Sequence, residues 1–313
     1  QATTEGGYDS PYLLYALSGL AGELPVTAIN YAVGKRAQAS RPSFKLSGSY
    51  RLKPDVTGYA TISTGFRTPI VNASAGRASV VDPGDLVIPD GADSDKLTNY
   101  EMGIKGRWLD GRLNASVAMY LIDWSDIQVQ ANRTSDSVQF ATNIGKARST
   151  GLEFEVTAMP WPSVTLGING SINDAEVTEL SAQEAAVSGA IEGIRLASPK
   201  FQGSVFMQYG FDVGQMSRGA FTVSVQHVDS YPGSFPYTPG SPGLISPTYG
   251  YTESYQNVGA TLGVSNGAWS VTGYVENLLD DDSITYIHPE AFLASRYGTM
   301  RPRTVGVRIG YDF

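Results

Sequence analysis

The residues whose types and spacing could do chemistry gather in an aromatic segment, residues 229–255, where aromatic side chains alternate with prolines and glycines. An aromatic ring offers a large contact area at low conformational cost, so such a segment could cover a bound molecule, or it could pack on itself. The chemistry would be binding rather than bond making. The candidate ligand contacts are Tyr231, Phe235, Tyr237, Tyr249 and Tyr251.

A cationic candidate, Arg67, follows a predicted strand and could pair with an anionic ligand or fix the end of that strand. Catalytic and metal chemistry have little support, because the chain has no Cys and only two His. It also lacks the zinc-protease HExxH pair, the GxSxG nucleophile turn and the phosphate-binding glycine loop. We therefore expect no enzyme activity, no metal site and no cofactor.

The segment before residue 96 is rich in carboxylates that could attract a cation. Oxygen-rich loops can hold Ca²⁺, but the twelve-residue pattern of a calcium loop is absent. We expect a solvated acidic surface loop instead. The carboxylates are Asp82, Asp85, Asp90, Asp93 and Asp95.

The elements that position these residues are predicted by alternation. The chain ends on a segment in which every second side chain is apolar, from Val305 to Phe313, which indicates a strand with one apolar and one polar face. Eleven such segments recur: 44–52, 56–62, 100–108, 115–121, 152–156, 164–168, 201–209, 221–225, 258–264, 269–275 and 305–313.

Short and long connections alternate between these strands, so all long loops should emerge at one end of the sheet. Short turns and long loops on opposite sides are typical of barrels of the bacterial outer membrane. Trp108, Trp161 and Trp269 lie at short-turn ends and Trp124 at a long-loop end, as expected for two interfacial girdles. The long loops are roughly 67–96, 125–147, 174–198, 229–253 and 280–300.

The polar faces carry charges of both signs, which a soluble sandwich would have to bury at high cost. We therefore predict an all-β, antiparallel transmembrane barrel with these residues in its lumen. Mixed signs favour mutual pairing, or contacts to something that fills the lumen. The predicted lumen-lining residues are Arg51, Glu101, Lys105, Glu153, Glu155, Glu276 and Arg308.

Composition agrees with this interpretation. The net charge of −8 argues against nucleic-acid binding, which requires a basic face. No apolar stretch reaches the length of a transmembrane helix, whereas barrel strands need only about 9–11 residues each.

Five blocks carry a resemblance to a known family: STGFRTP (63–69), LTNYEMGIKGRW (97–108), AMYLIDWSDIQVQ (118–130), ATNIGKARSTGLEFEV (141–156) and VENLLDDD (275–282). In this order, residues 41–313 resemble the C-terminal half of a TonB-dependent outer-membrane receptor. The resemblance implies a Gram-negative outer-membrane barrel of about 22 strands with a plugged lumen, of which this chain holds about the last 11. It also implies TonB-driven uptake of a scarce, bulky nutrient, such as a ferric siderophore, haem, a cobalamin or an oligosaccharide.

On this basis residues 1–42 are predicted to be an extracellular loop and residues 43–313 the barrel strands. Half a barrel would leave two unpaired edges in lipid, so the remaining strands, a plug and the TonB complex are expected partners, beside the bilayer itself. Two alternatives stay open. An autotransporter barrel also ends in an aromatic strand, although no pore-threading helix is visible here. A passive porin should show separate acidic and basic ladders.

Overall fold

The computed structural model describes residues 2–5, 35–133, 135–136, 138–288 and 296–312. Most of the predicted extracellular loop at 1–42, and the terminal Phe313, lie outside these residues. Within residues 1–42 the structure describes β1 (Ala2–Glu5) paired antiparallel with β2 (Arg36–Ala39). The role of this segment as an extracellular loop stays a prediction.

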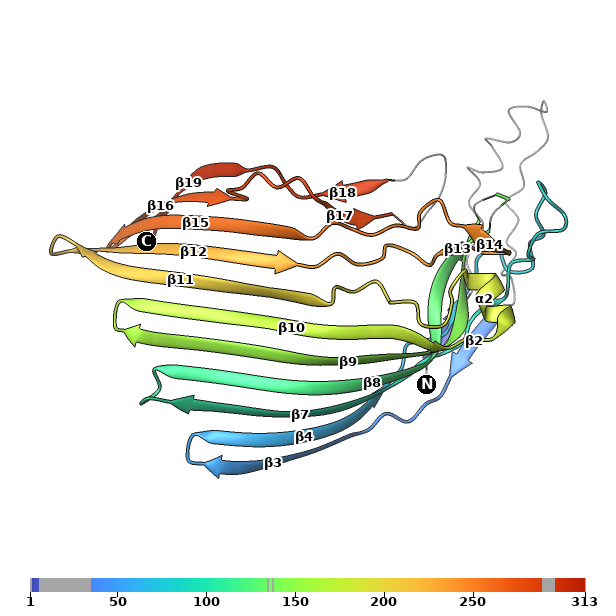
Figure 1. Cartoon of the computed structure of the whole chain (residues 1–313), viewed down its shortest axis with the longest axis horizontal. Helices are drawn as coiled ribbons and strands as arrows, with labels where there is room; N and C mark the ends of the chain where they lie inside the picture. Colours follow the sequence, from blue (N-terminus) through green and yellow to red (C-terminus); the bar gives the residue numbers. More distant parts are fainter. Residues whose placement is uncertain (1, 6–34, 134, 137, 289–295, 313) are drawn as a thin grey trace.

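The eleven predicted strands are confirmed as one antiparallel sheet, in which neighbours along the chain are neighbours in space (Figure 1). The strands are β3 (Lys45–Lys53), β4 (Val56–Gly65), β7 (Lys96–Trp108), β8 (Leu113–Asn132), β9 (Gln139–Trp161), β10 (Val164–Glu179), β11 (Phe201–Val213), β12 (Ser217–Val228), β15 (Tyr255–Asn266), β16 (Trp269–Glu276) and β19 (Thr304–Tyr311).

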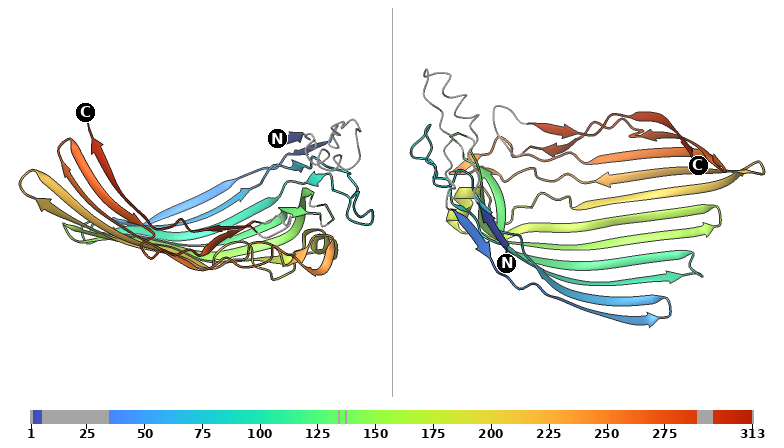
Figure 2. Two further views of the ribbon diagram at one scale, coloured as in Figure 1. Left: turned by 90° about the horizontal axis from the view of Figure 1, so that it is seen from above. Right: turned by 180° about the vertical axis from the view of Figure 1, so that it is seen from behind.

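The sheet is a curved, open wall whose two outer strands are β3 and β19 (Figure 2). Short turns lie at one end, and the long connections gather at the other with the helix α2 (Ala182–Ser188) (Figure 1). The predicted alternation of connections therefore holds. Among the described residues, β3 and β19 do not pair with each other, so the sheet does not close on itself.

The two faces of the wall differ sharply in polarity. Residues paired across strands share a face, so the register defines continuous rows. One row is polar throughout and borders a recess of about 790 Å³; it comprises Arg51, Thr57, Lys105, Ser116, Glu155, Asn169, Ser204, Gln226 and Asn257. A row on the other face is apolar: Ala60, Met102, Met119, Leu152, Ile172 and Phe201.

Two predicted loops contain more regular structure than expected. The prediction of a loop at 125–147 is wrong, because β8 and β9 continue through this segment as a long hairpin. The hairpin extends beyond Asp126, whose φ is 56°. In 174–198, β10 runs to Glu179, and α2 follows with a capping box between Ser181 and Glu184.

The remaining connections carry short antiparallel pairs. These are β5 (Ile70–Val71) with β6 (Gly91–Ala92), β13 (Tyr237–Thr238) with β14 (Ser241–Ile245), and β17 (Ile284–Ile287) with β18 (Tyr297–Thr299). In the described part of the chain, no helix is long and apolar enough to cross a membrane.

Two buried apolar clusters lie at the long-loop end. One comprises Ile127, Ile144, Ala147, Val177 and Ala190, and the other Ile88, Ala131, Val138 and Phe140. The ends of β8 and β9 contribute to both clusters. Alternation does not predict these contacts, because here both faces of the hairpin are covered by protein.

Candidate ligand site and lumen face

A cavity of about 700 Å³ lies among the long connections. Its walls come from the end of β8, the segment after α2 and residues 232–248. Most of the cavity lining is apolar, as is typical of small-molecule binding sites. The principal apolar side chains are Trp124, Ile127, Val129, Phe235, Leu244 and Ile245.

The segment 229–254 is held in place by its own backbone and by α2. Gly233 N donates to Gly250 O at 2.9 Å, and Tyr237 N donates to Gly189 O at 3.1 Å. Gly189 caps the helix with φ of 76°, and a Cβ at this position would lie 1.9 Å from the carbonyl oxygen of Tyr237. Only glycine permits both the backbone angle and the approach.

Two buried polar atoms at the cavity have no hydrogen-bond partner among the described residues. They are Thr238 Oγ1, in a residue only 8% exposed, and Arg195 Nε. The lining contains no carboxylate, and Arg133, which also borders the cavity, is paired with Asp136 at 2.7 Å. Leaving a buried hydrogen-bond donor unpaired is costly. A bound molecule with oxygen atoms could accept hydrogen bonds from Thr238 Oγ1 and Arg195 Nε.

Of the five aromatic candidates, Phe235 and Tyr237 line the cavity. Tyr231 instead donates to Thr285 O at 2.9 Å and ties its segment to the neighbouring connection. Tyr249 and Tyr251 contact each other edge to face, with ring centroids 6.1 Å apart. Their roles in binding stay predictions.

Arg67 lies close to the cavity and is already engaged. Its Nε and backbone N donate to Asp95 at 2.6 and 2.8 Å, and its guanidinium lies 4.8 Å from the ring centre of Trp124. A further bond, from Nη2 to Gln128 O at 3.0 Å, ties it to β8. A direct contact between Arg67 and a ligand stays a prediction.

Asp95 corrects the prediction of a wholly solvated acidic loop, since it is only 1% exposed. Burial alone would raise the pKa of this carboxyl, but hydrogen bonds from Arg67 and Trp124 outweigh it and lower the pKa. Trp124 is corrected as well. Its Nε1 donates to Asp95 at 2.9 Å and its ring packs on the buried cluster, so it belongs to no outward girdle. No sequence pattern predicts the hydrogen bond between Trp124 and Asp95, which are 29 residues apart.

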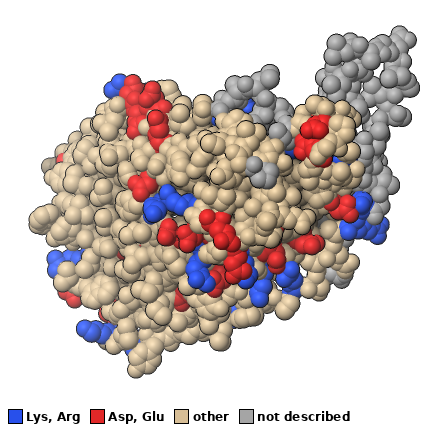
Figure 3. Space-filling model, turned by 45° about the vertical axis from the view of Figure 1, so that its right-hand side comes forward, with Lys and Arg blue, Asp and Glu red and all other residues tan. Residues whose placement is uncertain are grey.

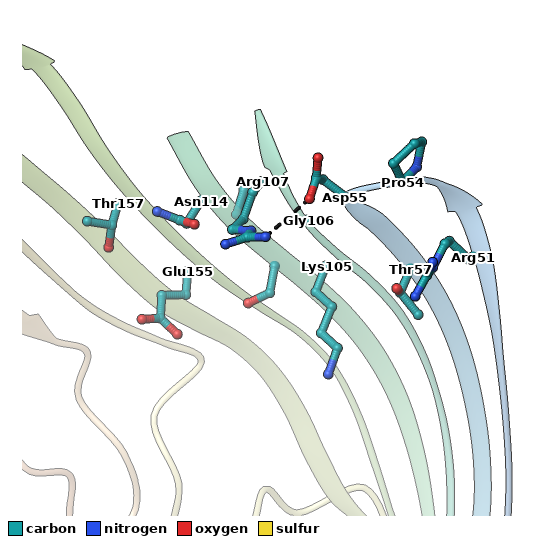
Figure 4. A pocket seen from close by; sticks show the side chains of 12 residues that line it. Arg51, Pro54, Asp55, Thr57, Lys105, Gly106, Arg107, Asn114, Glu155 and Thr157 are labelled. Atoms are coloured by element: carbon teal, nitrogen blue, oxygen red, sulfur yellow. Dashed lines mark hydrogen bonds and ion pairs between the residues drawn. The ribbon is translucent and has the colours of Figure 1, made fainter. Parts of the chain in front are cut away.

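Predicted lumen residues meet at the short-turn end of the polar face. Arg51, Lys105 and Glu155 border a recess of about 410 Å³, beside an ion pair of 3.2 Å between Arg107 and Asp55 (Figure 4). Their side chains come from β3, β7 and β9 and, for Asp55, from the turn before β4, and they border the same recess (Figure 4).

The other predicted lumen residues are distributed over the same face. Glu101 accepts a hydrogen bond from Tyr59 at 2.8 Å, and Glu153 borders the larger recess. Glu276 and Arg308 lie on the strands at the far edge, paired with Thr304 and Thr272, and do not meet the first group in this sheet.

The chemistry that these sites support is binding. Across the described residues, no group of three or more His, Cys, Asp or Glu side chains could hold a metal ion. The cavity supplies aromatic surface and hydrogen-bond donors, and the polar face supplies mixed charges that suit a solvated or protein-filled interior.

Curated relatives match parts of the chain. The ferric-pyoverdine M114 receptor PbuA of a Pseudomonas species is 41% identical over 59 residues, which are 19% of this chain and 7% of that receptor. An uncharacterised TonB-dependent receptor of Haemophilus influenzae is 24% identical over 181 residues, 56% of this chain and 46% of the relative. The chain thus spans less than half of these proteins.

Solved structures share the fold. The ferric yersiniabactin uptake receptor FyuA of Yersinia pestis superposes with a TM-score of 0.64 at 21% identity, over 86% of this chain and 37% of that one. The ferripyoverdine receptor of the Pseudomonas aeruginosa outer membrane superposes with a TM-score of 0.58 at 19% identity, over 86% of this chain and 32% of that receptor. A family model described as TonB dependent receptor-like, beta-barrel, matches residues 24–278. The chain therefore belongs to the TonB-dependent receptors and forms part of their outer-membrane β-barrel.

Proposed function

We propose that this chain is the C-terminal barrel portion of an outer-membrane active transporter that imports a ferric siderophore. The observation that carries the proposal is the cavity of about 700 Å³ at the long-loop end of a sheet with one polar and one apolar face. A cavity at that end would open on the outside of the cell, because outer-membrane barrels carry their long loops there.

The names of similar receptors support the proposed substrate class. The similar receptors are named for ferric yersiniabactin and ferripyoverdine. A ligand that combines ring systems with oxygen acceptors would fit this cavity. The rings of Phe235 and Tyr237 would contact the former, and Thr238 and Arg195 would donate to the latter. Haem, a cobalamin and an oligosaccharide are the competing ligands.

Uptake requires parts beyond this sheet. The edges β3 and β19 would pair with further strands of the receptor, because open sheet edges do not persist in lipid. A plug would fill the lumen against the mixed charges of the polar face, and the TonB complex would drive its rearrangement. The chain would bind and release its ligand without making or breaking a bond, so it would not act as an enzyme. The autotransporter and the porin have no comparable support from the family match.

The test uses the intact receptor that contains this chain, expressed in an iron-starved Gram-negative host without its own siderophore receptors. Radioactive iron would be supplied as hydroxamate, catecholate and phenolate chelates, with haem, cobalamin and an oligosaccharide in parallel. We expect uptake of at least one chelate, lost when the proton gradient is dissipated, while binding in the cold persists. Correctly inserted receptor that takes up none of the chelates would contradict the proposal.

Site variants then examine the cavity. Phe235→Ala and Tyr237→Ala should each weaken binding about tenfold, since truncating a central aromatic contact commonly costs more than about 1 kcal/mol. Tyr297→Ala, which removes an exposed aromatic ring outside the cavity lining, is the matched control and should bind normally. Equal losses in all three variants would argue against this cavity as the ligand site.

A further inference from the structure

The polar face of the wall carries most of its charges on one side. One row in register holds Arg51, Lys105 and Glu155 on β3, β7 and β9. Beyond β9 the same row is uncharged and continues through Asn169, Ser204, Gln226 and Asn257 on β10, β11, β12 and β15. The next row toward the long loops changes in the same way after Glu153, with Ser171, Gln202, Val228 and Tyr255.

A third row, nearer the short turns, is also uncharged on these strands. It pairs Gln208 with Thr222, and Thr222 with Thr261. Residues paired across strands share a face, so all three rows border the same space. We call six of these hydroxyl and amide residues the neutral strip: Asn169, Ser204, Thr222, Gln226, Asn257 and Thr261.

Charged residues flank the neutral strip. Asp212 lies opposite Arg218 beside the short turn between β11 and β12, and Glu276 and Arg308 lie on β16 and β19. Figure 3 shows a similar unevenness on one side of the molecule, where charged side chains gather and leave large areas without charge. The strip is therefore a bounded uncharged area on a face whose other strands carry charges of both signs.

The two parts of the polar face hold polar groups with different strength. On the charged strands, the carboxylate of Glu101 accepts from Tyr59 at 2.8 Å. In the strip, Asn169 Nδ2 donates to Ser204 Oγ at 2.9 Å, and Gln226 is exposed. Hydrogen bonds to charged groups are about twice as strong as neutral ones. Neutral groups also exchange one partner for water at a small net cost, so a molecule would move along the strip more readily.

The strands of the strip also carry much of the ligand cavity. Residues 195–197 of the cavity lining lead into β11, and residues 232–248 join β12 to β15. On the polar face of these strands, Asn169, Ser204 and Gln226 border the recess of about 790 Å³. A ligand released inward from the cavity would therefore reach the strands that carry the strip.

We propose that the neutral strip lines the side of the lumen along which the imported ligand passes. Passage requires contacts that are numerous and individually weak, so that the ligand can leave each of them. Hydroxyl and amide side chains supply such contacts to a ligand with oxygen acceptors, whereas the charged strands would hold a plug more firmly. This inference rests on the proposed uptake function and adds which wall of the lumen serves it.

The test narrows the strip in the intact receptor and measures initial uptake of the chelate that the parent imports. Ser204→Trp/Gln226→Trp should slow uptake at least about tenfold, because passage depends on the width of the path. Binding in the cold should stay within about threefold of the parent, since the ligand cavity is unchanged. The matched control is Thr57→Trp/Ser116→Trp, which places the same side chains in the same row on the charged strands. It should slow uptake less than about threefold.

A second variant separates a narrowed path from a loss of structure. Ser204→Ala/Gln226→Ala removes the same polar groups without adding bulk and should import at a rate close to that of the parent. Normal uptake by Ser204→Trp/Gln226→Trp, equal losses in both tryptophan variants, or a parallel loss of cold binding would each overturn the inference. A parent receptor that imports none of the chelates would instead refute the proposed function.

Discussion

The wall of eleven strands and the layer of long connections at its end suit different surroundings, lipid for the wall and water for the connections. Along the wall, large apolar side chains such as Met102, Met119 and Val307 remain exposed on one face. We count the long connections, α2 and the adjoining ends of β8, β9 and β10 as the loop layer; in it, Ile144, Val177 and Phe140 are almost fully buried. The wall depends on lipid to cover its apolar side, whereas the loop layer folds around its own cores as a water-soluble protein does.

Ion pairs show the same difference. Arg133 and Asp136 in the loop layer are 0% and 7% exposed, and Arg133 also donates to the carbonyls of Arg77 and Leu86. Arg148 and Asp123 on the wall are 55% and 46% exposed. Identical chemistry thus fixes a buried loop in one region and orients surface charges in the other, so its removal should have unequal effects.

The largest expected effect comes from breaking the buried pair. Asp136→Ala should destabilise the loop layer by about 3–5 kcal/mol, because Arg133 is left as an uncompensated buried charge. Asp123→Ala, the exposed counterpart, should cost no more than about 1 kcal/mol. Hydrogen exchange at the β8–β9 hairpin measures both, and equal protection in the two variants would contradict the contrast.

A charge placed on either face of the wall should give the next largest effect. Val117→Arg faces lipid near the middle of the apolar rows and should cost about 2–4 kcal/mol. Ser116→Arg places the same side chain one residue away on the polar face and should cost less than about 1 kcal/mol. Reversible urea unfolding in lipid vesicles would compare them, and a reversed order would refute the assignment of faces.

Low pH should destabilise the loop layer before the wall. We expect this effect to be smaller than those of the two pairs of substitutions. Burial favours the protonated forms of Asp95 and Asp136, but hydrogen bonds from Arg67 and Trp124 to the former, and from Arg133 and Val138 to the latter, lower the pKa of both. Their stabilisation is present above the ordinary value of 3.8 and is lost as the pH falls through the lower folded values.

The measurement is exchange protection of the β8–β9 hairpin between pH 5 and pH 2. Protection should fall only below about pH 4, and Asp95→Asn should remove part of that dependence. A hairpin that loosens above pH 5 would show that other groups control it.

Much of the wall was predictable because a period of two is visible in the sequence. Every strand of the sheet and the face of residues such as Lys105 and Glu155 followed from alternation. The loop layer was less predictable. The hairpin beyond Asp126 lies in the predicted loop 125–147. Residues 127–132 do alternate between apolar and polar side chains, but residues 139–143 on the returning strand do not.

The cavity was predictable only in part. Of the five aromatic candidates, Phe235 and Tyr237 line the space. Backbone hydrogen bonds from Tyr237 and Gly240 to Gly189 and Ala186 hold this part of the segment against α2, and alternation does not predict such contacts. The network of Arg67, Asp95 and Trp124 joins residues from separate elements, and no local pattern marks such a junction.

The central claim is that one face of the wall contacts lipid and the other contacts a polar interior. A chain without Cys allows single cysteines to be placed at each position from Asn114 to Ile122 and labelled with a nitroxide in the intact receptor in bilayers. We predict that oxygen accessibility alternates with a period of two, high at Ala115, Val117, Met119 and Leu121 and low at the residues between. Accessibility without this alternation would contradict the account.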